Sequence, residues 1–189
     1  IKNGFEGFLK QSMELGRSFV IPEYQKNPYA LFMLWKGILH YILKNEELKY
    51  IIGPVSISNQ YSKVSMSLII DFIQENYLDK AKAAFISPRN RFKYQRSKNE
   101  TPLKPRNIKE LESLIEEMEP AHFKLPILLK KYLKQNARII GFNVDPKFNN
   151  ALDGLMYLNI DHLNMEIIQM LSKEVEDPSV LERFGYIPD

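Results

Sequence analysis

Residues 12–42 constrain the fold more than any other stretch, because they read as a strand, a tight polar loop and a helix. Residues 19–21 (Phe-Val-Ile) favour extended backbone, and Pro22 stops the strand. Asn27 is a good N-cap, and Pro28 fits the first helical position, where its missing N–H costs nothing. The helix is expected to bury one apolar face with three-to-four spacing, made of Leu31, Leu34, Trp35, Ile38, Leu39 and Ile42.

The start of this helix is a physical site for an anion. The N–H groups of a first helical turn have no partner inside the helix, and the positive end of the helix dipole lies beside them. A strand that leads into such a turn therefore favours a phosphate or a pyrophosphate as ligand.

The rest of the chain predicts an α/β (α+β) fold, with a mixed, twisted sheet flanked by helices. Residues 48–57 form a second strand, in which Gly53 and Pro54 are expected to force a bend or a bulge. The order strand, helix, strand favours a right-handed crossover and parallel pairing. The other expected helices are a lead-in helix in 1–10, a helix capped by Ser62, a helix over 108–118 and a helix after Pro120. The helix capped by Ser62 is expected to carry Val64, Leu68, Ile69, Phe72, Ile73 and Tyr77 on one face, and the helix after Pro120 to face inward with Leu125, Leu128, Leu129, Tyr132 and Leu133. Two further strands, 137–142 and 151–158, are expected to form a hairpin.

Length and composition indicate one globular domain over residues 1–189. The chain is 44% hydrophobic and 26% charged, and no apolar run reaches the roughly eighteen residues of a membrane span. The lack of cysteine excludes disulfides and thiolate nucleophiles, and fits a reducing, cytoplasmic location. Because there is no initial Met and no signal peptide, we expect the chain to begin inside a longer product.

Positive charge is concentrated in residues 80–106. Nine basic residues there face a single acidic one, Glu100, so the segment carries +8, and the rest of the chain carries −5 of the total +3. Such a segment suggests an anionic partner. With Phe85, Phe92 and Tyr94 it could contact nucleic acid, but it matches no nucleic-acid signature, so that partner is the least expected. A solvated loop, a membrane-surface patch and a dock for an acidic carrier protein remain as alternatives.

Few residues suggest catalysis by themselves. His40, His122 and His162 are isolated, so no metal site is expected, and the glycine-rich phosphate and nucleophile motifs are absent. In a regular strand Glu14 and Arg17 point to opposite faces, so they would need a bulge to meet. Either they face a cleft, where Glu14 could accept a proton from an amine, or they lie on a solvated or subunit-facing surface.

Asp153 is a carboxylate inside an apolar strand. Alternation places it on one face with Leu155 and Tyr157. A charge in that position must be paired, hydrogen-bonded or open to a cleft. Arg138 on the neighbouring strand is the expected structural partner, and a catalytic role is the alternative.

Several blocks in combination resemble a known family. They are Glu14 to Val20 (Glu-Leu-Gly-Arg-Ser-Phe-Val), Trp35 to Ile38, Gly53 to Ile57, Leu125 to Leu133, and Gly141 to Asn150 with Asp153 behind it. The combination resembles the hemolysin-named N-acyltransferases of the ornithine-lipid or glycine-lipid synthase type, found in Bacteroidetes, which are divergent members of the GNAT superfamily. It is also similar to the acyl-homoserine-lactone synthases, whose Glu-x-x-Arg-Phe-x-Val strand resembles the first block, although Ser18 stands here at the position of the phenylalanine.

The resemblance implies transfer of a fatty acyl group from acyl-acyl-carrier protein to the amine of an amino acid, in aminolipid synthesis. The thioester carbonyl would meet backbone amide where two central strands splay, one ending near Val20 and the other near Ile57, with no acyl-enzyme. It implies Glu14, Arg17 and Asp153 as catalytic residues. The phosphopantetheine arm of the carrier would be bound by Val20, Gln25, Lys26, Asn27, Tyr29, Ser56 and Ser58.

Two departures from the family pattern shape the expectation. Asn27, Pro28 and Ala30 stand where the superfamily loop carries glycines, which favours a carrier-bound donor over acyl-coenzyme A. Such domains also have three strands before the central one, and about a dozen residues precede Glu14 here. We therefore expect a domain that is partial at its N-terminus and completed by other strands, a partner or a homodimer. The alternative hypothesis is a non-enzymatic module that uses segment 80–106 at a membrane surface, peripheral to the inner membrane, or on nucleic acid.

Overall fold

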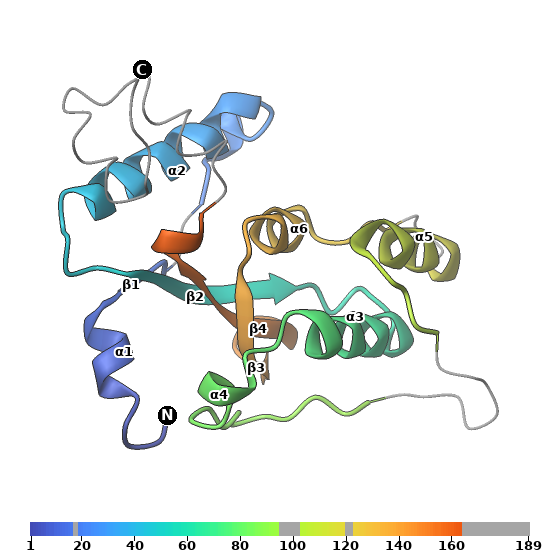
Figure 1. The fold of residues 1–189 in the computed structure, drawn as a ribbon. Helices are drawn as coiled ribbons and strands as arrows, with labels where there is room; N and C mark the ends of the chain where they lie inside the picture. Colours follow the sequence, from blue (N-terminus) through green and yellow to red (C-terminus); the bar gives the residue numbers. More distant parts are fainter. Residues whose placement is uncertain (17–18, 95–102, 120–122, 164–189) are drawn as a thin grey trace.

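The structure, a computed structural model, describes residues 1–16, 19–94, 103–119 and 123–163 (Figure 1). Its centre is a four-stranded sheet in the order β1-β2-β4-β3. The strands are β1 (Ser12–Glu14), β2 (Tyr50–Ile57), β3 (Arg138–Asp145) and β4 (Ala151–Asn159). The helices are α1 (Glu6–Lys10), α2 (Pro28–Leu43), α3 (Lys63–Asn76), α4 (Lys80–Ala83), α5 (Ile108–Met118) and α6 (Ile127–Lys134), with 3₁₀ turns at Pro22–Tyr24 and Ile160–His162.

The sheet is mixed, as the order of elements predicts. β1 pairs parallel to β2 across the α2 connection, whereas β2–β4 and β3–β4 are antiparallel. The hairpin of β3 and β4 is confirmed, as is the expectation of a mixed sheet flanked by helices. The α+β class is therefore established.

Each face of the sheet carries its own hydrophobic cluster, because successive side chains of a strand point to opposite faces. The larger core joins one face to the buried sides of α2, α3, α5 and α6. The smaller cluster lies on the face we name the α1 face, and its members are Phe5, Ile52, Ile140 and Tyr157, with Phe8, Leu9, Tyr50, Phe85, Ile86 and Leu155 packed against them. Figure 1 shows α1 and α4 on one side of the sheet and α2 and α6 on the other.

Local capping signals predict where α2 and α3 begin. Asn27 Oδ1 accepts a hydrogen bond from the Tyr29 amide at 2.9 Å, and Ser62 Oγ accepts one from the Ser65 amide at 3.1 Å. Helix α5 begins and ends at the predicted residues. These signals work because a cap satisfies N–H groups only two or three residues away.

Four expectations about the fold are wrong. The first strand stops at Glu14 instead of running to Ile21, and Phe19 is 78% exposed. The bulge expected in β2 at Gly53 and Pro54 is not found, because β2 pairs with β4 in one register through both residues. The irregularity lies instead in β3, between Ile139 and Gly141. Two apolar side chains expected to face inward, Val64 and Leu128, are each 43% exposed. None of the described residues between Leu15 and Ile21 pairs with a neighbouring strand, and without backbone partners extended residues do not form a sheet.

Within the described ranges, no helix is both long and apolar enough to cross a membrane. The expectations for the tail after residue 163 lie outside those ranges.

A charged cluster ties α4 to β4 on the α1 face. Lys82 Nζ donates to Asp79 Oδ2 at 3.0 Å and to Tyr157 Oη at 3.2 Å, and Tyr157 Oη donates to the same Asp79 oxygen at 2.7 Å. The Lys82 ammonium also lies 4.7 Å from the centre of the Tyr157 ring. Burial by itself would raise the pKa of Asp79, but the hydrogen bonds from Lys82 and Tyr157 outweigh it and lower that pKa to about 2.

This cluster predicts an acid-sensitive contribution to stability. Because the Asp79 pKa falls from 3.8 to about 2 on folding, its stabilisation is complete above pH 3.8 and is lost as the pH falls through 2. Asp79→Asn keeps a capping side chain but removes the charge, and should lower the free energy of unfolding by about 2 kcal/mol at pH 7. Urea unfolding at pH 7 and pH 2 measures this, with the exposed Glu46→Gln as control. An equal loss at both pH values contradicts the prediction.

Candidate functional site

The parallel pair β1–β2 opens after three residues. Pairing runs from Ser12–Tyr50 to Glu14–Ile52, and the Leu15 amide donates to the Ile52 carbonyl at 2.8 Å. β2 then continues to Ile57 beside β4 alone among the described strands. Backbone groups on this edge of β2 are thus open to an extended ligand. The two strands were expected to separate near Val20, but they separate earlier in the chain, after Leu15.

Gly53 sits where the two strands separate. A Cβ atom on this residue would lie 2.9 Å from the backbone oxygen of Leu15, closer than packed atoms approach. The position therefore requires glycine, because any side chain would push β1 away from β2.

Glu14 and Asp153 lie on the same face of the sheet. In the parallel register Glu14 is opposite Ile52, which belongs to the small cluster on the α1 face. In β2 and β4, Pro54 pairs with Leu155 and Ser56 with Asp153, and these residues continue the same alternation. Two of the three predicted catalytic residues, Glu14 and Asp153, therefore lie on one face of the sheet. Arg17 lies outside the described residues.

Asp153 has a different partner from the one expected. Ser56 Oγ donates to Asp153 Oδ1 at 2.7 Å. Arg138 is instead opposite Tyr157 and donates to the Asn76 carbonyl at 3.2 Å. The predicted Arg138–Asp153 ion pair is wrong, because four residues of strand separate their positions by about 13 Å.

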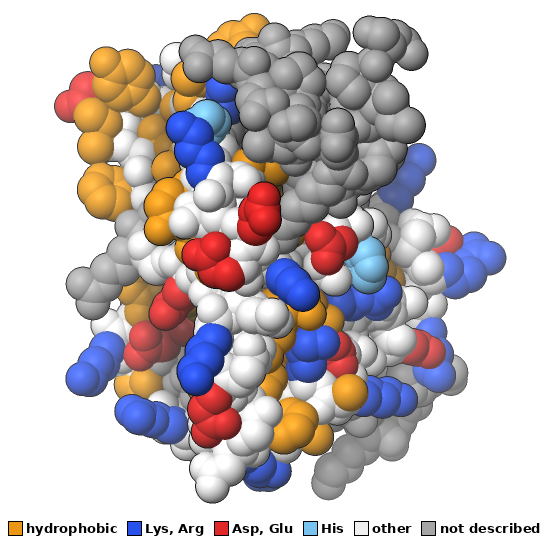
Figure 2. All heavy atoms as spheres, turned by 60° about the vertical axis from the view of Figure 1, so that its left-hand side comes forward, with side chains coloured by type: hydrophobic (Ala, Val, Ile, Leu, Met, Phe, Trp, Pro, Cys, Tyr) orange, Lys and Arg blue, Asp and Glu red, His pale blue; other side chains and the backbone are white. Residues whose placement is uncertain are grey.

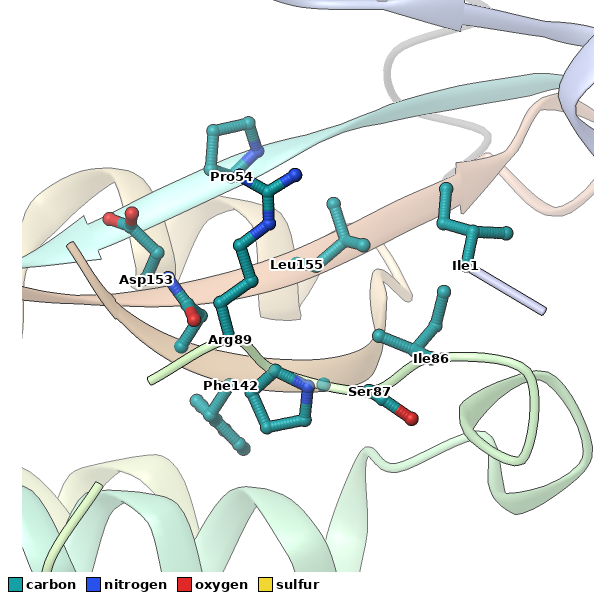
Figure 3. A pocket seen from close by; sticks show the side chains of 11 residues that line it. Ile1, Pro54, Ile86, Ser87, Arg89, Phe142, Asp153 and Leu155 are labelled. Carbon is teal, nitrogen blue, oxygen red and sulfur yellow. The ribbon is translucent and has the colours of Figure 1, made fainter. Parts of the chain in front are cut away.

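A cavity of about 290 Å³ lies against this part of the α1 face (Figure 3). Arg89 and Asp153 carry the charged side chains of its described wall. Figure 3 shows Arg89 crossing the cavity toward Pro54, with Asp153 beside it. The sides are apolar and include Pro54, Ile86, Phe142 and Leu155. An apolar cavity with a few convergent polar groups is typical of a small-molecule site.

The predicted donor-binding residues fall into two groups. Gln25, Lys26 and Tyr29 are exposed around the capped start of α2, and Gln25 Nε2 donates to the Val20 carbonyl at 2.9 Å. Ser56 belongs instead to the Asp153 site, and Ser58 Oγ accepts from the Gln60 amide at 3.2 Å. Figure 1 shows the start of α2 well separated from the end of β2. The structure therefore does not bring all seven predicted residues, Val20, Gln25, Lys26, Asn27, Tyr29, Ser56 and Ser58, into one site.

Exposed apolar side chains gather beside the start of α2. Phe19 is 78% exposed, Tyr29 69%, and Tyr24 and Met33 56% each. Figure 2 shows hydrophobic atoms concentrated on the upper left of the molecule, at the level of α2. Large exposed apolar patches mark surfaces that contact another molecule.

Basic side chains are only partly available to a partner. Lys82 is held by Asp79, Arg106 pairs with Glu110 at 2.9 Å, and Lys130 pairs with Glu112 at 2.7 Å. Lys131 and Lys134 of α6 are exposed. A second cavity, of about 550 Å³, lies between α3, α5 and α6, and four basic side chains line it: Arg106, Lys109, Lys130 and Lys134.

Among the described residues, no three histidine or acidic side chains gather as metal ligands.

Sequence reasoning missed Arg89 and Asn143 as site residues. Arg89 counted only as one of nine basic residues in a loop, and Asn143 as part of a hairpin. No local pattern distinguishes Arg89 from Arg91, because its place depends on how the loop docks on β3. The hydrogen bonds of Asn90 to Asn143 and Val144 make that contact across more than fifty residues of sequence.

Comparison with known proteins gives two related sequences. The chain is 28% identical over 159 residues to a protein of Phocaeicola vulgatus named glycine N(alpha)-acyltransferase, a match that covers 78% of this chain and 43% of the relative. It is 33% identical over 79 residues to a protein of Bacteroides thetaiotaomicron with the same name, covering 39% of this chain and 23% of the relative. No family model and no solved structure matches. The chain thus spans less than half the length of either curated relative, and it is similar to proteins named as acyltransferases that act on an amine.

Proposed function

We propose that this chain is part of an N-acyltransferase that moves a fatty acyl group from acyl-acyl-carrier protein to the amine of an amino acid, of the glycine or ornithine type, in aminolipid synthesis. The observation that carries the proposal is the opening between β1 and β2, together with the position of Glu14 and Asp153 on the same face of the sheet. The names of the two relatives support acyl transfer to an amine.

In the proposed reaction the donor is the thioester itself. Its carbonyl would lie along the open edge of β2, where the backbone N–H of Ser56 can polarise it, since Pro54 has no N–H. The amine nitrogen forms the new bond to the carbonyl carbon and loses a proton, the C–S bond breaks, and the carrier sulfur leaves as a thiolate, which becomes the carrier thiol when the same proton is passed to it. Glu14 would take, through intervening water, the proton that the attacking nitrogen loses, because its position is about 13 Å along the sheet from that of Asp153. No acyl-enzyme is needed, which suits a chain without cysteine.

The proposed donor path uses the other features of the surface. The phosphate of the phosphopantetheine arm would lie at the positive end of the α2 dipole beside Lys26, where it would share the Tyr29 N–H with the Asn27 cap. The exposed apolar side chains next to it would contact the acyl chain or a membrane surface. The exposed lysines of α6, Lys131 and Lys134, would attract an acidic carrier protein.

The test uses the full-length protein that contains this chain. It is supplied with acyl-acyl-carrier protein and a panel of amino acids, and mass spectrometry identifies the products. We expect an N-acylated amino acid, and equal exposure to acyl-coenzyme A should give much less of it. Absence of any N-acylated product across the panel contradicts the proposal.

A further inference from the structure

The structure assigns the 290 Å³ cavity on the α1 face as the site of the acceptor amino acid, with Arg89 binding its carboxylate and Asp153 its amino group. This inference rests on the proposed function and deepens it, because it names the site and the residue that selects an amino acid over a simple amine.

The charges of the cavity are complementary to a zwitterion. Throughout the described ranges Arg89 forms no ion pair, although Asp153 lines the same cavity. One Asp153 oxygen accepts from Ser56, which leaves the second free to accept from an ammonium group. An open guanidinium can bind a carboxylate through two parallel hydrogen bonds. The two groups therefore suit the two ends of one amino acid.

The loop that carries Arg89 is held firmly on β3. The Asn90 amide donates to Asn143 Oδ1 at 2.9 Å, Asn90 Nδ2 donates to the Val144 carbonyl at 3.1 Å, and the Val144 amide donates to the Asn90 carbonyl at 2.9 Å. These three bonds fix the residue next to Arg89. A binding group positioned this way loses less entropy when the ligand arrives.

The size and lining of the cavity restrict the acceptor. A volume of about 290 Å³ is at the small end of ligand sites. Its described wall offers Asp153 as the sole carboxylate, and the remaining sides near Phe142 and Leu155 are apolar. A second ammonium, as in ornithine, would have no acidic partner there. The site therefore fits a small amino acid with an uncharged side chain.

The cavity also lies next to the opening that would hold the thioester. Pro54 lines the cavity and directly follows Gly53, where β1 and β2 separate. An amino group held at Asp153 is thus on the face of β2 from which it can reach the open edge.

The test compares glycine with glycinamide, which keeps the amine and lacks the carboxylate. In the full-length protein, Arg89→Met should raise KM for glycine about 10- to 100-fold, with kcat little changed, since one charge-assisted interaction is lost. Its kcat/KM for glycinamide should stay at the wild-type value. Asp153→Asn should weaken both acceptors equally. The matched control is Arg91→Met, which removes the same charge from an exposed neighbour outside the cavity wall and should leave both acceptors unchanged.

Binding of glycine without donor separates this inference from the proposed function. Saturation-transfer NMR should detect glycine on the wild-type protein and not on Arg89→Met. Product formation with an unchanged KM in Arg89→Met overturns the site and leaves the proposed function standing. Arg89-dependent binding of glycine without any acyl transfer supports the site and overturns the function. Equal effects of Arg89→Met and Arg91→Met, or an equal loss with glycinamide, overturn the assignment of Arg89.

Discussion

Gly53→Ala should reduce acyl transfer about a hundredfold and destabilise the domain by about 1–3 kcal/mol. The added methyl group would lie 2.9 Å from the Leu15 carbonyl oxygen, which is backbone and cannot rotate away. Relief requires β1 to move from β2, which strains the hydrogen bond from Leu15 to Ile52 and shifts the edge that would hold the thioester. A displacement near 1 Å at a reacting centre costs on the order of 10²-fold in rate. Initial rates and urea unfolding of the full-length protein measure both effects.

Gly37→Ala is the matched control for this substitution. Gly37 lies inside α2, and a Cβ atom there would meet no heavy atom within 4 Å apart from the adjoining backbone of its own helix. The same change should therefore stabilise the protein by about 0.5–1 kcal/mol, because alanine restricts the unfolded chain and favours helix. A Gly53→Ala protein that is as stable and as active as wild type contradicts the assignment of this position as the point where the strands must separate.

Glu14→Gln should lower kcat for amine acylation by about 10²- to 10⁴-fold, the usual contribution of a general base. Stability should hardly change, because Glu14 is exposed at the end of β1 and the amide has nearly the same shape. Acylation rates at saturating amino acid, with unfolding curves in parallel, measure the effect.

Glu46→Gln is the control, since Glu46 is an exposed carboxylate in the turn before β2. It should keep wild-type kinetics. Full activity in Glu14→Gln would remove the proposed role of this carboxylate, and a loss shared by Glu46→Gln would indicate a general effect of charge.

The site was predicted less completely than the elements that build it. Glu14 and Asp153 are on one face of the sheet, but the pairing of Asp153 depends on register. The sequence pattern predicts that Asp153 lies in a strand, and charge alone makes Arg138 a reasonable ion-pair partner for it. The observed register places Ser56 and Asn143 beside Asp153, because β4 pairs with β2 and β3 over seven to eight positions each. Register reflects the sum of these contacts and cannot be read from one residue.

Features that depend on neighbours in sequence could be read directly. The local features are the Asn27 and Ser62 caps, the bounds of α5 and the β3–β4 hairpin, which depend on bonding and periodicity over a few residues. The parallel return of β2 depends on a single helical crossover between two strands. Features that depend on distant segments needed the folded chain. The early end of β1, the exposed Leu128 and the arrival of Arg89 beside Asp153 follow from which strand edges and loops find partners far along the sequence. The difference is physical, since local hydrogen bonds are specified by adjacent residues, whereas docking energy belongs to pairs of surfaces that meet only after folding.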